Sequence, residues 1–118
     1  MEYNITKEDD VFIINLLGDL VAGKIYSLKE DVEKILKQEK PKIIFNFADV
    51  EFIDSSGIGL IVNALKKLSE KNSKLKLCNL NKTVTNIFKQ IKIYSFFEVY
   101  DSLDEAIDSF ESWGKCIF

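Results

Sequence analysis

Residues 54–59 read Asp54-Ser55-Ser56-Gly57-Ile58-Gly59. They stand between an apolar run at 43–47 and an amphipathic stretch at 58–68, which predicts a strand, a tight turn and a helix. Aspartate and serine cap the first free amides of a helix, and glycine lets the backbone approach its neighbours closely. The same amides and the positive end of the helix dipole favour an anion. Two interpretations stay open: a hydroxyl that only caps the helix, and a serine that carries a phosphate.

The composition is that of an ordinary globular protein. The chain has 118 residues, of which 47% are hydrophobic and 30% charged, so residues 1–118 are expected to form a single domain. The net charge of -3, with no basic stripe, argues against direct binding of nucleic acid. No apolar run approaches the roughly 20 residues of a membrane span, and the first residues do not resemble a signal peptide. We therefore expect a cytoplasmic protein.

The absence of histidine excludes several kinds of site. Neither a histidine metal site nor a Ser-His or Cys-His nucleophile is possible. Cys78 and Cys116 lie far apart and form no metal or redox spacing, so we expect reduced thiols, with Cys78 in the core. No glycine-rich loop of the common phosphate-binding kind is present. We expect no metal, no cofactor and no catalytic residue.

Apolar periodicity predicts strands and helices that alternate along most of the chain. Strands are expected at 2–7, 11–17, 43–47, 74–78 and 97–100, the first two joined as an antiparallel edge hairpin. Helices are expected at 24–38, from the serine turn to Leu68, after a cap at Asn81 or Thr83, and after a capping box at Ser102–Glu105. The predicted fold is α/β, with a mixed, largely parallel sheet of four to five strands and about four helices.

The helix after the serine turn is expected to present one apolar face to the core. Leu60 falls opposite that face at 100° per residue, beside the small Gly57 and Gly59. It is interpreted either as a docking surface or as an ordinary exposed leucine. The predicted core positions are Ile58, Ile61, Val62, Leu65 and Leu68.

Loops that follow parallel strands gather at one end of a sheet. We therefore expect the loop at Gly18-Asp19-Leu20 to lie beside the loop at Asp54-Ser55-Ser56.

Three stretches carry a resemblance to a known family: Gly18-Asp19-Leu20, 52–59 (Phe-Ile-Asp-Ser-Ser-Gly-Ile-Gly) and 103–107 (Leu-Asp-Glu-Ala-Ile). On these stretches and the order of the elements, the sequence resembles a STAS domain, and within that family a bacterial anti-sigma factor antagonist. The resemblance implies one STAS-like domain over residues 1–118. The chain departs from the pattern in two places: Val21 stands where many members carry a second acid, and the chain reads Gln90-Ile91-Lys92-Ile93 where a glycine often ends the third helix.

The resemblance also implies a binding protein switched by phosphorylation. In that family the second hydroxyl of the motif, here Ser56, is phosphorylated by the partner anti-sigma factor, itself a serine kinase. The unphosphorylated form binds the anti-sigma factor and frees a sigma factor, the phosphorylated form does not bind, and a phosphatase resets the cycle. Asp54 and Ser55 are expected to hold the turn, with Ser55 turned into the cap. The residues expected to bind the partner are Asp19, Asp54, Ser55, Gly57, Gly59 and Leu60.

Two other functions remain open. The first is a non-switching STAS interaction module, in a stress-signalling scaffold or a transporter-associated complex, where Ser56 only caps the helix. The second is an enzyme with Ser55 or Ser56 as nucleophile, in which a lysine or a carboxylate would replace the absent histidine base.

Overall fold

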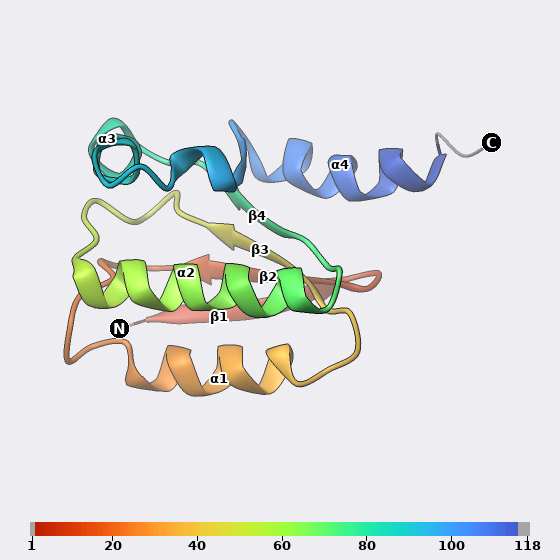
Figure 1. The fold of residues 1–118 in the computed structure, drawn as a ribbon, viewed down its shortest axis with the longest axis horizontal. Coiled ribbons are helices and arrows are strands. Elements are labelled where there is room, and N and C mark those ends of the chain that lie inside the picture. Colours follow the sequence, from red (N-terminus) through yellow and green to blue (C-terminus); the bar gives the residue numbers. More distant parts are fainter. Residues whose placement is uncertain (1, 116–118) are drawn as a thin grey trace.

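The protein is described by a computed structural model that covers residues 2–115, with side chains through Phe110. In this range the strands form one sheet in the order β1-β2-β3-β4-β5 (Figure 1). β1 is antiparallel to β2, and all other neighbours are parallel, which confirms the predicted edge hairpin and the largely parallel sheet. The strands are β1 (Tyr3–Glu8), β2 (Val11–Leu16), β3 (Lys42–Asn46), β4 (Leu75–Cys78) and β5 (Glu98–Tyr100). The helices are α1 (Tyr26–Leu36), α2 (Ser55–Glu70), α3 (Lys82–Gln90), the short 3-10 helix η1 (Tyr94–Phe96) and α4 (Leu103–Lys115).

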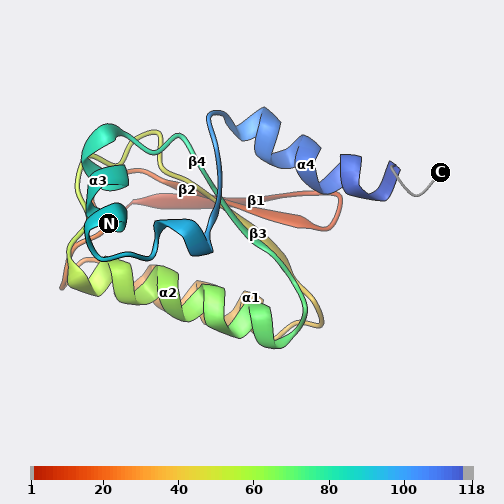
Figure 2. The same ribbon diagram turned by 45° about the horizontal axis from the view of Figure 1, so that its top comes forward.

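The near-continuous apolar run of β2 is explained by cover on both faces of the sheet. Ile14 and Leu16 point into the core beneath α1 and α2, whereas Val11 and Ile13 point toward α4. Figures 1 and 2 show α1 and α2 on one side of the sheet and α4 on the other. A strand buried on both faces needs apolar side chains in both directions, and this is why the run lacks strict alternation.

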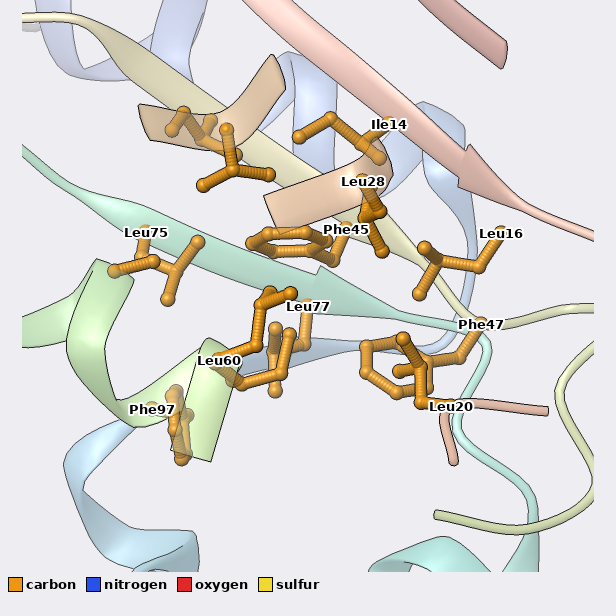
Figure 3. Packing of buried hydrophobic residues seen from close by; sticks show 14 of the residues in the cluster. Ile14, Leu16, Leu20, Leu28, Phe45, Phe47, Leu60, Leu75, Leu77 and Phe97 are labelled. Carbon is orange, nitrogen blue, oxygen red and sulfur yellow. The ribbon is translucent and has the colours of Figure 1, made fainter. Parts of the chain in front are cut away.

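The structure corrects the predicted orientation of α2. Leu60 is buried, with 7% of its surface exposed, whereas Val62, predicted to be core, is 36% exposed. Figure 3 shows Leu60 among core side chains that include Phe45 and Leu77. The prediction placed the apolar face by its large aliphatic residues and left out the small ones. Gly57 and Ala64 are buried too, and they move the centre of the buried face toward Leu60.

Helix ends confirm several local predictions and refine others. Asn81, rather than Thr83, caps α3 by accepting a hydrogen bond from the amide of Val84 at 2.8 Å. Ser102 accepts from the amide of Glu105 at 3.2 Å, but Glu105 reaches back to the amide of residue 101 rather than to that of Ser102. The predicted capping box is therefore confirmed in one of its two bonds.

The loop after α3 contains a residue other than glycine in the left-handed conformation. Lys92 has a φ of 64°, the left-handed conformation that commonly follows a helix and favours glycine. Although the chain has no glycine in this stretch, a lysine adopts the conformation that glycine favours.

Cys78 is fully buried, which confirms its predicted place in the core, and this burial raises the pKa of its thiol to about 11. The expectation for Cys116 lies outside the described residues. In the range 2–115, none of the helices combines the length and apolar character needed to cross a membrane.

Candidate functional site

The two loops predicted to be neighbours meet at the start of α2. Leu20 and Ile53 form an isolated parallel bridge. The amide of Leu20 donates to the carbonyl of Phe52 at 3.2 Å, and the amide of Asp54 donates to the carbonyl of Leu20 at 3.0 Å. This short piece of sheet beyond the ends of β2 and β3 fixes the position of the serine turn, and the predicted proximity is confirmed.

Asp19 holds the loop that leads into the turn. Its Oδ1 accepts hydrogen bonds from the amides of Glu51 at 3.0 Å and Phe52 at 3.1 Å. The phenyl ring of Phe52 stays 47% exposed beside the serine turn. Asp19 itself is exposed, so its predicted role toward a partner stays a prediction, while the structure shows that it organises the loop.

Asp54, rather than Ser55, caps α2. Its Oδ1 accepts from the amides of Ser56 at 2.9 Å and Gly57 at 3.1 Å, and its Oδ2 accepts from the amide of Ala22 at 2.8 Å. These bonds, above all the one from Ala22, hold the pKa of the carboxyl below its usual value, so the group is ionised at neutral pH. The expectation that Ser55 turns into the cap is wrong, because Asp54 occupies the N-cap position and already satisfies these amides, whereas Ser55 is the first residue of the helix itself.

Ser55 and Ser56 are the first two residues of α2, and both are exposed. Because Asp54 supplies the cap, neither hydroxyl is needed to begin the helix. The interpretation in which Ser56 serves only as a cap therefore has no support in the geometry.

The two glycines of the motif have different surroundings. A Cβ atom on Gly57 would lie 2.5 Å from the carbonyl oxygen of Leu20 and 2.7 Å from the side chain of Ile53. A Cβ atom on Gly59 would meet nothing within 4 Å. Gly57 is buried and is thus required for the close approach of α2 to the neighbouring loop, while its predicted role toward a partner stays a prediction. Gly59 is exposed and available to a partner.

A groove of about 640 Å³ between α1 and α2 opens beside Ser56. Leu60 and Val32 are its buried apolar residues. Leu60 therefore forms part of the floor of the groove and does not project into solvent. The charged residues along the groove are Lys29, Glu33 and Lys67. Glu33 accepts hydrogen bonds from Lys67 at 2.7 Å and from Asn63 at 3.1 Å, and these bonds, that from Lys67 first, lower the pKa of its carboxyl.

The groove residues on α1 were missed by the sequence analysis. Tyr26 is 74% exposed and, with Lys29, lines the groove next to the serine turn. Lys29 and Glu33 are four residues apart and so lie on one side of α1, but nothing in the sequence indicates that this side packs against α2. Across the described part of the chain, no group of acidic or cysteine side chains is arranged to hold a metal ion.

Comparisons with known proteins identify relatives of this chain. A family model described as "STAS domain" matches residues 2–106. The "Anti-sigma F factor antagonist" of Paenibacillus polymyxa is 24% identical over 103 residues, which cover 86% of this chain and 87% of the relative. A relative from Thermotoga maritima is 30% identical over 101 residues, which cover 85% of this chain and 89% of the relative.

Solved structures share the fold. The anti-sigma factor antagonist SpoIIAA, in its unphosphorylated form, superimposes with a TM-score of 0.79 at 23% identity, covering 94% of this chain and 97% of that one. Its phosphorylated form, from Bacillus, gives a TM-score of 0.74 at 22% identity, covering 92% and 98%. With a family model that matches nearly the whole described range, the chain belongs to the STAS domain family.

Proposed function

We propose that this chain is an anti-sigma factor antagonist whose binding to an anti-sigma factor is abolished by phosphorylation of Ser56. The observation that carries the proposal is an exposed serine hydroxyl on the first turn of α2 that the fold does not use, because Asp54 makes the cap. The relatives named as antagonists, and the existence of SpoIIAA in two phosphorylation states, support the same function.

The proposed cycle needs two further proteins. The anti-sigma factor acts as a kinase: the Ser56 hydroxyl attacks the γ-phosphorus of ATP, ADP leaves, and the hydroxyl proton passes to the kinase. A phosphatase adds water to the phosphoserine, which returns the serine and inorganic phosphate. The chain itself contributes a shaped surface, held by Asp19 and Asp54, and no catalytic group.

Electrostatics can make this switch effective. A phosphate adds roughly -1.5 to -2 charges, and at Ser56 it would stand beside the ionised carboxylate of Asp54. A partner that covers this surface must desolvate both negative groups. A hundredfold loss of affinity requires about 2.8 kcal/mol, a plausible magnitude for one buried and unpaired charge.

An enzyme that uses Ser55 or Ser56 as nucleophile is disfavoured by the same contacts. Such a nucleophile needs an adjacent base. Asp54 is the acid next to these hydroxyls, and its two oxygens already accept three amide hydrogens. The site therefore favours a serine that is the substrate of another enzyme over a serine that is itself a catalytic nucleophile.

Phosphopeptide mapping after incubation with ATP and the cognate anti-sigma factor tests the proposal. We expect phosphate on Ser56, none in Ser56→Ala, and unchanged modification in Ser55→Ala as the matched control. Phosphate on Ser55, with Ser56→Ala still fully modified, would refute the assignment. Stable binding to the partner with no modification of either serine would favour a non-switching STAS interaction module.

A further inference from the structure

The amides that usually bind an anion at a helix start are already occupied in α2. Free amides of the first turn attract phosphate groups in many proteins. Here the amides of Ser56 and Gly57 donate to Asp54, as does the nearby amide of Ala22. Because this carboxylate is itself negative, it occupies the amides and also repels a second anion. Any cation of the protein that binds a phosphate on Ser56 must therefore come from outside the first turn of α2.

The groove next to Ser56 contains two lysines that could provide this charge. Lys67 is already paired, since its Nζ lies 2.7 Å from Oε2 of Glu33. Lys29 makes no ion pair with any of the described side chains, although its charge contributes to lowering the pKa of Glu33. Of the two groove lysines, Lys29 is therefore the one without an ion-pair partner among the described residues.

The helix alignment places Lys29 near the phosphate-bearing end of the groove. α1 and α2 lie side by side and run in the same direction (Figure 1). Glu33 contacts both Asn63 and Lys67, which sets that part of α1 level with the middle of α2. Lys29, one turn earlier, is then roughly one to two turns, about 5 to 10 Å, along the axis from Ser56. Both residues line the same groove, so a flexible lysine side chain and a phosphate extending from Ser56 can approach each other across it.

We propose that the phosphate of phosphorylated Ser56 is bound by Lys29 across the α1–α2 groove. This inference rests on the proposed function for the identity of the modified residue. Phosphorylation then does two things to the surface: it adds negative charge beside Asp54, and it neutralises the unpaired positive charge on α1. A partner that recognises the groove through Lys29 loses that contact in the same event.

The test installs phosphoserine at position 56 during translation, so that no kinase is needed. ³¹P NMR then measures the second pKa of the phosphate, ordinarily near 6. We expect this pKa to rise by about half a unit in Lys29→Gln, since a lysine close to the phosphate favours its dianionic form. The matched control is Lys34→Gln: Lys34 lies on α1 outside this groove, 4.0 Å from Asp31. Its effect should stay within about 0.1 unit because of screening by water and salt.

Two results would overturn the inference: equal phosphate pKa values in the Lys29→Gln and Lys34→Gln proteins, or a larger rise in Lys67→Gln than in Lys29→Gln. Raising the salt concentration to 1 M should shrink the Lys29 effect, since the Debye length falls to about 3 Å. Thermal melts of the unphosphorylated variants show whether each is folded. The NMR result does not depend on the natural acceptor, so failure of the proposed function, seen by phosphopeptide mapping, is distinguishable from failure of the Lys29 contact.

Discussion

α2 and α3 begin with the same arrangement of capping side chain and hydroxyl. Asp54 and Asn81 each accept a hydrogen bond from an amide of the first turn, and Ser56 and Thr83 are each the second residue of their helix. Both hydroxyl-bearing residues are exposed. Both capping residues are also part of, or bonded to, the loop that leads into α2. Asn81 donates to the carbonyls of Val50 at 2.9 Å and of residue 51 at 3.3 Å, and Asp54 is the last residue of this loop.

The difference lies in what surrounds the hydroxyl. Asn81 is a neutral cap whose Nδ2 donates to backbone carbonyls of the loop before α2. Asp54 is charged, it is followed by Gly57 pressed against Leu20, and Ser56 opens on a groove with two lysines. A capped helix start with an exposed hydroxyl is therefore not sufficient to indicate a switch; the charge and the adjoining groove distinguish α2 from α3.

The largest expected effect concerns the buried side of α2. Leu60→Glu should destabilise the protein by about 3 to 4 kcal/mol, because it places a carboxylate among core side chains. Val62→Glu, on the exposed side of the same helix, should change stability by no more than about 0.5 kcal/mol. Urea denaturation measures both. Similar stabilities for the two variants would mean that α2 does not present Leu60 to the core.

The two glycines give the next largest contrast. Gly57→Ala should cost about 2 to 3 kcal/mol, because the new methyl group meets the backbone oxygen of Leu20. Gly59→Ala should instead stabilise the helix by up to about 1 kcal/mol, since its methyl group enters open space. Thermal unfolding of the pair is the measurement. A destabilised Gly59→Ala protein would contradict the described exposure of that position.

The two caps should differ in their response to pH. Asn81→Ala should cost about 1 to 2 kcal/mol at every pH between 3 and 7. The carboxyl of Asp54 has a lowered pKa in the folded state, so its ionised form stabilises the protein above the unfolded pKa near 3.8. That contribution is lost as the pH falls through the folded value. The stability gap between wild type and Asp54→Asn should therefore narrow below about pH 4, whereas a constant gap would contradict the carboxylate cap.

The smallest expected effect compares a new charge at the two matched positions. Thr83→Asp should stabilise α3 by about 0.3 to 1 kcal/mol through the helix dipole. Ser56→Asp should gain less than this, because Asp54 already holds the amides and repels the added charge. Differential scanning calorimetry resolves the two melts. A larger gain at Ser56 than at Thr83 would mean that the start of α2 remains an available anion site.

Much of the fold could be predicted from the sequence, because it depends on periodicity and on backbone rules. The edge hairpin, the parallel strands and the proximity of the Asp19 and Asp54 loops follow from apolar runs and from the geometry of parallel sheets. The rotation of α2 did not follow. It depends on how closely the helix approaches the sheet, and the small residues that permit this approach, Gly57 and Ala64, carry little weight in a hydrophobic pattern.

The candidate site was predictable in its residues but only partly in their roles. Asp54, Ser55 and Ser56 were all expected at the start of the helix, yet three similar polar side chains compete for the same amides, and only tertiary contacts decide among them. The amide of Ala22, distant in sequence, commits Asp54 to the cap. The groove depends on the pairing of α1 with α2, a contact between side chains that no local pattern encodes.

The most direct test of the central claim is the affinity of the anti-sigma factor for two singly phosphorylated proteins. Phosphoserine is installed either at position 56 or, in place of Thr83, at position 83, and isothermal titration calorimetry compares each with the unmodified chain. The account predicts a Kd raised about a hundredfold, roughly 2.8 kcal/mol, by phosphate at position 56, and a Kd unchanged within about twofold by phosphate at position 83. Equal affinities of all three proteins, or equal losses at the two positions, would contradict a switch located at Ser56.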